Sequence, residues 1–187
     1  MNPTLDQLSE QFARLVRPVA VASKSPLPVS TPSTPPAAPA AVAGVAAPAA
    51  PPAPPPGPVQ TVDHVLKGYH LEVAVAPGQV VIAAGILDQN GFGLDAITGV
   101  DWIAQNEMEV VYDYFHPASP LRVVVRTRLP RDHSEVPSIS GVFPGANWHE
   151  RETHDFFGIV FHGHPNLAPF LLPEDADYHP LRKDFAS

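Results

Sequence analysis

The chain contains no cysteine among its 187 residues. Disulfide bonds, thiolate metal sites and iron–sulfur clusters held by cysteine are therefore excluded for this chain. The dinucleotide-binding pattern G-x-G-x-x-G and the phosphate-binding P-loop are also missing, so no motif supports nucleotide binding. We accordingly expect the chain to bind no cofactor.

Basic residues are few compared with acidic ones. The chain has 11 Lys and Arg against 19 Asp and Glu, which gives a formal net charge of −8. Because binding to a phosphate backbone needs clustered Lys and Arg, nucleic acid is not an expected partner. Apolar runs stay well below the roughly 20 residues of a membrane-spanning helix, and Asp6 and Glu10 stand where a secretory signal would be basic. We expect contact with a membrane only indirectly, through partner proteins.

Proline is abundant, with 25 residues, most of them within residues 18–58. This segment is mainly Pro, Ala, Ser, Thr and Val, with Lys24 as its only charged residue, and its composition predicts a disordered Pro/Ala-rich linker. In residues 1–17, apolar side chains recur at helical spacing and predict a short amphipathic helix. Residues 59–187 are long enough to form a folded domain with its own core.

Short apolar segments punctuated by turn residues open this predicted domain. Residues 69–75 and 80–84 flank a Pro-Gly turn and predict a β-hairpin. Residues 109–115 and 121–128 predict two further strands. The continuous run Val123–Val125 is typical of a central strand covered on both faces.

The remaining segments complete the prediction of the fold class. Residues 129–140 are polar, contain two prolines and predict a loop, and a helix and an extended tail follow. Strands and helices in this order predict an α+β fold, in which helices pack on a mixed β-sheet.

The predicted C-terminal helix has an unusual face. Asn147 and Glu150 have the spacing of a capping box, and Gly158 falls where the helix would end. Arg151 and Asp155 stand four residues apart and are expected to pair. The helical period places aromatic and charged side chains in one stripe: Trp148, Arg151, Glu152, Asp155, Phe156 and Ile159. This stripe is either a partly exposed rim or a charge network buried in the domain or at a contact between subunits.

Two sequence blocks in the last quarter of the chain carry a family resemblance. The first reads E-R-E-x-x-D-x-x-G-I-x-F-x-G-H-P from Glu150 to Pro165, and the second reads P-L-R-K-D-F from Pro180 to Phe185. In this order and spacing they resemble the 30-kilodalton subunit family of respiratory complex I, the proton-pumping NADH:quinone oxidoreductase. We interpret these motif residues as an interface with other subunits: Trp148, Glu150, Arg151, Glu152, Asp155, Gly158, His164, Pro165, Pro180, Leu181, Arg182, Lys183, Asp184 and Phe185.

The resemblance implies a non-redox structural subunit of the peripheral, hydrophilic arm of such a complex, with no catalytic residues of its own. Its partners would be the other peripheral-arm subunits, above all the large subunit at the quinone site. It would lie at the cytoplasmic face of the bacterial inner membrane and support electron transfer from NADH to quinone coupled to proton translocation. The alternative is the equivalent subunit of a membrane-bound hydrogenase or formate hydrogenlyase complex.

The terminal block has two interpretations, which are compatible. As a docking strip, it offers Leu181 and Phe185 as apolar anchors and Arg182 for bidentate bonds across an interface. Alternatively, Pro180–Phe185 packs back on its own domain.

Histidines are frequent between His149 and His179 and invite a metal-site hypothesis. His149 and His154 are five positions apart, so they diverge by about 140° on a helix, unlike the pair in H-E-x-x-H. His162 and His164 lack an evident third ligand, although a zinc site takes at least three protein ligands. We expect no metal ion. A metal-dependent hydrolase, and a scaffold that recruits partners through its proline-rich segment, are the alternatives from other classes.

Overall fold

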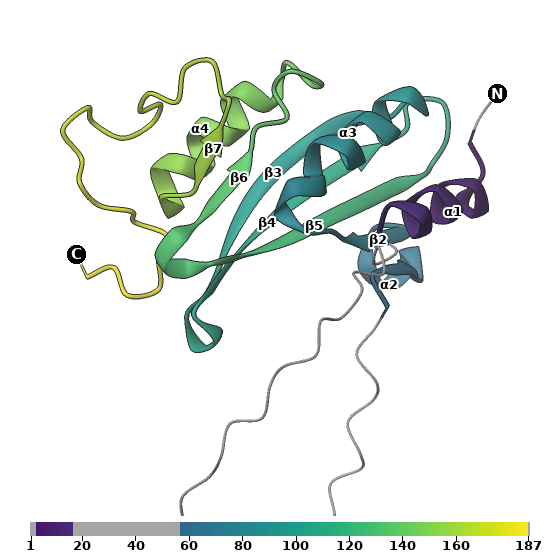
Figure 1. The fold of residues 1–187 in the computed structure, drawn as a ribbon, viewed down its shortest axis with the longest axis horizontal. Coiled ribbons are helices and arrows are strands. Elements are labelled where there is room, and N and C mark those ends of the chain that lie inside the picture. Colours follow the sequence, from purple (N-terminus) through teal and green to yellow (C-terminus); the bar gives the residue numbers. More distant parts are fainter. Residues whose placement is uncertain (1–2, 17–56, 187) are drawn as a thin grey trace, which may run out of the picture. The chain divides into compact units, whose positions relative to one another are not determined.

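The computed structural model describes residues 3–16 and 57–186, which form an α+β unit around one hydrophobic core (Figure 1). The main sheet has the order β1-β2-β5-β4-β3. Its strands are β1 (Val59–Thr61), β2 (Leu71–Ala74), β3 (Gly93–Trp102), β4 (Glu107–Phe115) and β5 (Arg122–Pro130). A second, two-stranded sheet consists of β6 (Glu135–Pro137) and β7 (Val160–His162). The helices are α1 (Leu5–Val16), α2 (His64–Lys67), α3 (Val80–Gln89) and α4 (Ala146–Phe157), and single 3₁₀ turns are η1 (Pro77–Gln79), η2 (Ile103–Gln105) and η3 (Arg131–His133).

The sheet is mixed, as the sequence predicts. β2 pairs with β5 in parallel, whereas β1 with β2, β4 with β5 and β3 with β4 are antiparallel. The two strands predicted at 109–115 and 121–128 are confirmed as β4 and β5. β5 is the central strand, and Val123–Val125 are all buried in it.

Helix α1 confirms the amphipathic helix predicted near the N-terminus. Thr4 and Gln7 form a reciprocal pair of side-chain bonds at its start, the pattern of a capping box. Leu8 and Phe12 are fully buried in the core, which stabilises a helix too short to persist alone. The linker predicted at 18–58 lies, up to residue 56, outside the described residues.

The hairpin predicted at 69–75 and 80–84 is wrong in its second arm. β2 occupies the first segment, but the apolar run after Pro77 continues through η1 into the helix α3. In α3, Val80, Ala83, Ala84 and Leu87 are buried and spaced as one helical face. A short apolar run fits a strand and a buried helix equally well. Here the packing of the run against the core favours the helix.

The polar loop predicted at 129–140 contains the short strand β6. Its three residues pair in parallel with β7, and the Ser138 N–H continues the contact by donating to the His162 carbonyl (2.8 Å). Both strands are too short to show periodicity in the sequence. None of the described helices is long and apolar enough to cross a membrane.

Candidate functional site

The C-terminal tail, residues 163–186 after β7, caps helix α4. The last four carbonyl groups of a helix lack partners inside the helix and must find them elsewhere. Here Gly158 N–H donates to His154 (2.8 Å), His179 Nδ1 to Asp155 (2.8 Å), Leu181 N–H to Phe156 (3.2 Å) and Arg182 Nε to Phe157 (2.7 Å). Three of these four donors come from the tail. The P-L-R-K-D-F block therefore packs back on its own domain, as one of the two interpretations predicts.

Gly158 makes this contact possible. It ends α4 in the left-handed conformation, with φ of 71°, as its position in the sequence predicts. A Cβ atom at this position would lie 2.5 Å from both Arg182 Nη2 and His179 Nε2. The glycine thus serves the turn and the close approach of the tail at once.

A buried carboxylate at the end of β3 holds the other side of the tail. Asp101, with 1% of its side chain exposed, accepts two bonds from Arg131 (2.9 and 3.0 Å) and one from Lys183 N–H (2.9 Å). Arg131 also bonds Asp184 (2.5 Å). The Arg131 guanidinium holds the pKa of Asp101 below its usual value, although burial opposes this. Sequence reasoning missed both Asp101 and Arg131, because they lie far from the motif along the chain.

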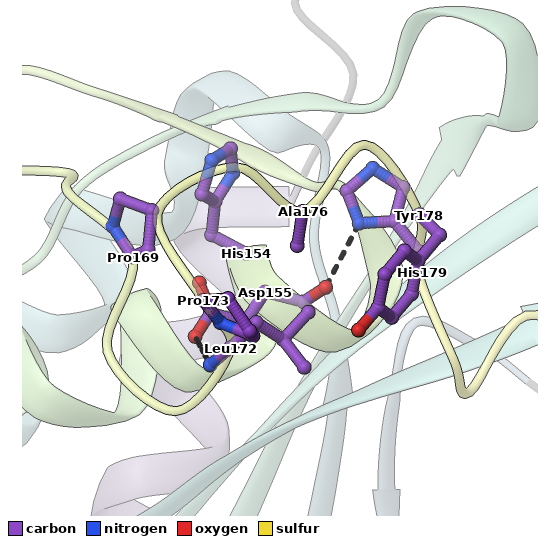
Figure 2. Close-up of a pocket in the computed structure, with 8 residues that line it drawn as sticks. All are labelled: His154, Asp155, Pro169, Leu172, Pro173, Ala176, Tyr178 and His179. Atoms are coloured by element: carbon purple, nitrogen blue, oxygen red, sulfur yellow. Dashed lines mark hydrogen bonds between the residues drawn. The ribbon is translucent and has the colours of Figure 1, made fainter.

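Asp155 organises the tail segment between the two motif blocks. Its Oδ2 accepts three backbone N–H bonds, from Phe170 (2.8 Å), Leu171 (2.7 Å) and Leu172 (3.2 Å). Burial acts to raise the pKa of Asp155, but these three bonds outweigh it and the pKa is lowered. Figure 2 shows the tail folded around Asp155 with His154 and His179 at the wall of a small cavity. The cavity, about 50 Å³, has room for a few water molecules.

The predicted pairing of Arg151 with Asp155 is wrong. Arg151 instead donates to the carbonyl groups of Ala168 (2.9 Å) and Pro169 (2.8 Å) in the tail. Its guanidinium lies 5.2 Å from the centre of the Trp148 ring and 5.0 Å from that of Phe170. The two residues predicted to form one pair therefore hold two different stretches of the tail.

The predicted single stripe on α4 is also wrong in part. Trp148 is 54% exposed, whereas Ile159 is fully buried and follows the end of the helix. Arg151 and Glu152 are partly buried and Asp155 is buried. The stripe is neither a uniform exposed rim nor a single buried network, because each charged residue has its own surroundings.

Glu150 does not cap the helix, contrary to the predicted capping box. Helix α4 begins at Ala146, so Asn147 lies inside its first turn. Glu150 is fully buried and accepts bonds from Ile139 N–H (2.8 Å) and Ser138 Oγ (2.6 Å). His164 Nε2 lies 3.9 Å from the same carboxylate and donates to the Asn147 carbonyl (3.2 Å). Glu150 thus ties α4 to the segment after β6, and His164 ties the G-H-P turn to α4.

Replacing Glu150 by Gln should make the stability of the fold less dependent on pH. Burial raises the pKa of Glu150 above its usual 4.5, although bonds from Ser138 and Ile139 oppose this. A raised pKa stabilises the fold below pH 4.5, and this contribution is lost as pH rises through the raised value. Urea unfolding from pH 4.5 to about 8 should therefore show a smaller loss of stability for Glu150→Gln than for the parent chain.

Glu174→Gln is the matched control for this prediction, because Glu174 is exposed on the tail. Its unfolding free energy should follow the parent chain at every pH. Parallel curves for the parent chain and Glu150→Gln would show that the buried carboxyl does not titrate in this range.

The tail turns polar groups inward and apolar groups outward. Its Arg182 side chain, its Lys183 N–H and its Asp184 carboxylate bond α4, Asp101 and Arg131, as described above. Large apolar side chains remain exposed on the tail and the adjoining face of α4: Trp148, Phe170, Leu171, Tyr178, Leu181 and Phe185. Trp148 packs on Phe170 and Tyr178 stacks on Phe185, so the exposed rings form two pairs. We call these six residues the α4–tail surface.

Four of the five histidines between His149 and His179 serve as hydrogen-bonding residues. His154 donates to the Ile159 carbonyl (2.9 Å), and His162 bonds Glu135 (2.5 Å) on the neighbouring strand. Within residues 3–16 and 57–186, no three His, Asp or Glu side chains come together in a way that could hold a metal ion. Pro165 is exposed beside His164, and Pro180 is partly buried where the capping segment begins.

Comparison with known families identifies the family of this chain. Residues 73–187 match the family described as respiratory-chain NADH dehydrogenase, 30 Kd subunit. The chain belongs to this 30-kilodalton subunit family. The match covers more than half of the chain and includes both motif blocks, α4 and the described tail.

Two curated proteins named as subunits of dehydrogenase or oxidoreductase complexes are similar to about half of this chain or more. An NADH-quinone oxidoreductase subunit of Roseiflexus sp. (strain RS-1) is 41% identical over 120 residues, which are 61% of this chain and 68% of the relative. An F(420)H(2) dehydrogenase subunit of Methanosarcina mazei is 42% identical over 93 residues, which are 49% of this chain and 59% of the relative.

A solved structure shares the fold of the 30-kilodalton subunit domain. A chain in the structure of the membrane-bound sulfane sulfur reductase, an archaeal respiratory membrane complex, superposes with a TM-score of 0.57 at 30% identity. The superposition covers 62% of this chain and 71% of that chain. The predicted family and fold class are both confirmed.

Proposed function

We propose that this chain is a structural subunit of the peripheral arm of a complex I-type NADH:quinone oxidoreductase. In this role it docks on the large subunit at the quinone site through the α4–tail surface. It supports electron transfer from NADH to quinone, coupled to proton translocation, by bracing the subunits that hold the redox centres. It lies peripherally at the cytoplasmic face of the bacterial inner membrane.

The observation that carries the proposal is the two-sided tail. Bonds to α4, Asp101 and Arg131 fix its backbone, so the exposed Trp148 and Phe185 rings are presented from a rigid support. Binding to a preorganised surface avoids much of the entropy cost of ordering a loop. Aromatic side chains with polar neighbours are also typical of the residues that dominate binding energy where two proteins meet.

The names of similar proteins support NADH as the electron donor. Those of Roseiflexus and Moorella thermoacetica are both named as subunits of NADH-quinone oxidoreductase. The alternative is the equivalent subunit of a membrane-bound hydrogenase or formate hydrogenlyase complex, and other similar proteins show that related subunits occur in complexes with other electron donors or acceptors. One is named for F(420)H(2), and the similar solved structure is a sulfane sulfur reductase. Affinity purification of the tagged chain from its host distinguishes the two, because the subunits recovered with it include the one that accepts electrons from the donor.

Replacing Trp148 or Phe185 by Asp should weaken docking without unfolding the chain. A charge placed on an aromatic anchor of an interface costs about 2 kcal/mol or more, which is a loss of affinity of about 30-fold. The measurement is the amount of large subunit recovered with the tagged variant, together with its thermal unfolding midpoint.

Leu66→Asp is the matched control, because Leu66 is 81% exposed on α2, outside the α4–tail surface. It should recover as much large subunit as the parent chain does. Full recovery with both Trp148→Asp and Phe185→Asp would contradict docking through this surface.

A further inference from the structure

A groove runs between the edge strand β3 and helix α4, next to the α4–tail surface but separate from its aromatic pairs. One wall is the β3 segment Ala96–Gly99, and the other is formed by His149, Glu152 and Phe156 of α4. Leu181 of the tail closes one end. The groove has a volume of about 300 Å³, and α4 lies alongside β3 (Figure 1). We call it the β3–α4 groove.

The backbone bonds of the sheet determine which groups of β3 face the groove. In a strand, successive residues point their N–H and C=O groups to opposite sides. The backbone carbonyl of Arg126 in β5 accepts a hydrogen bond from Val75 N–H (2.9 Å) on the side of β2. The backbone groups of its neighbour Val125 therefore point to the other side, toward Tyr112 of β4. In β4, the backbone groups of Val111, next to Tyr112, therefore point away from β5 and bond those of Thr98 in β3.

It follows that Ile97 and Gly99, on either side of Thr98, point their backbone groups away from the sheet. The Ile97 carbonyl accepts a long bond from Thr153 Oγ1 of α4 (3.4 Å), which agrees with this direction. Gly99 makes no hydrogen bond on this side to any other residue in the described part of the chain. Both residues are buried, and unpaired backbone groups in buried positions are costly. The groove therefore contains strand groups that lack a partner.

The charge in the groove indicates what kind of partner fits. Glu152 is the one charged side chain lining it, and it makes no ion pair or hydrogen bond within residues 57–186. His149 is the other titratable group in the wall. A second copy of this chain fits poorly, because each copy carries a net charge of −8 and would bring a second Glu152 toward the first. A segment with Lys or Arg complements the groove.

We propose that an extended, basic segment of a partner subunit binds in the β3–α4 groove as an additional strand of the sheet. Its backbone pairs with the free N–H group of Ile97 and with the free N–H and C=O groups of Gly99, and a Lys or Arg side chain reaches Glu152. Extended segments bind sheet edges in this way in many complexes, with main-chain bonds for affinity and side-chain contacts for selectivity. The inference rests on the proposed function, because it names a second contact with the same assembly.

Hydrogen exchange at single amides tests the backbone part of the proposal. Exchange is measured for the full chain alone and for the complex that its tagged form recovers from the host. The Gly99 amide should exchange at least about tenfold more slowly in the complex. The Thr98 amide is an internal control, because its bond to β4 is present in both states and its rate should not change.

The outcomes separate this inference from the proposed function. If the complex is recovered but Gly99 exchanges equally fast in both states, the groove is empty in the assembly and only this inference fails. If no large subunit is recovered at all, the proposed function fails, and the inference fails with it.

Charge substitutions test the basic character of the segment. Glu152→Lys should lower recovery of the partner at least about tenfold, and Glu152→Gln should lower it less, because it removes attraction without adding repulsion. Asp6→Lys makes the same charge change on an exposed position of α1 and should have no effect. Equal recovery with Glu152→Lys, Asp6→Lys and the parent chain would overturn the charge complementarity. The unfolding midpoint of each variant verifies that it is folded.

Discussion

Replacing Gly158 by Ala is expected to destabilise the fold by about 3 kcal/mol and to detach the tail from α4. The left-handed backbone alone costs an alanine about 1–2 kcal/mol. The added Cβ would also lie 2.5 Å from Arg182 and His179, so both must move and lose their bonds to α4, at about 1 kcal/mol each. Urea unfolding measures the loss of stability, and limited proteolysis of the last residues measures the release of the tail.

Gly163→Ala is the matched control for this substitution. Gly163 has a similar positive φ of 82°, but no atom lies within 4 Å of the position of its Cβ. It should therefore cost only the backbone penalty of about 1–2 kcal/mol and leave the tail resistant to protease. Equal costs for the two variants would mean that the tail does not depend on the open space at Gly158.

Replacing Asp101 by Ala should have an effect of similar size from the opposite side of the tail. The substitution leaves the Arg131 guanidinium without its buried partner and Lys183 N–H without an acceptor. Removing one member of a buried ion pair costs about 3–5 kcal/mol, and the slight exposure of Arg131 favours the lower end. Urea unfolding and proteolysis of the tail again provide the measurement.

Asp184→Ala provides the control for Asp101→Ala, because Asp184 bonds the same arginine from a side chain that is 52% exposed. An exposed ion pair contributes little to stability, so Asp184→Ala should cost much less than Asp101→Ala. The stabilisation by Asp101 should also disappear in acid. Because the pKa of Asp101 is lowered in the folded chain, its contribution to stability is fully present above pH 3.8. This contribution is lost as the pH falls through the lowered pKa. If Asp101→Ala lowered the free energy of unfolding no more than Asp184→Ala does, the buried ion pair of Asp101 and Arg131 would not hold the tail.

The confirmed elements β4, β5, α1 and α4 have long patterns, although β3, which is 10 residues long, was not predicted. β4 and β5 extend over nine residues each, and α1 and α4 over 12 residues each, so several repeats of the strand or helix period are present. α3 was mispredicted because its apolar run does not distinguish a helix from a strand, and β6 was missed because it has only three residues. Val80–Ala84 fits both periods, and the strand identity of Glu135–Pro137 depends on pairing with β7, 25 residues further along the chain.

The sequence predicted which residues belong to the candidate site, but not the hydrogen bonds that they form. Helical spacing places Arg151 near Asp155, yet both find backbone partners in the tail, whose course no local pattern reveals. One feature of the sequence could have indicated the role of Asp101. This residue lies two residues beyond Gly99 and four beyond Ile97, at the positions of β3 that face the core, where a carboxylate needs a buried partner.

The bonds of Asp101 also have a consequence for the order of folding. They join residues that are 30 positions apart, at Arg131, and 82 positions apart, at Lys183. Contacts between such distant residues form after local ones, because the intervening chain must first be ordered. We therefore expect the apolar rings at the end of the chain to reach their final positions only once the sheet exists. A partly folded chain would then lack the complete α4–tail surface, so the proposed docking would require the folded chain.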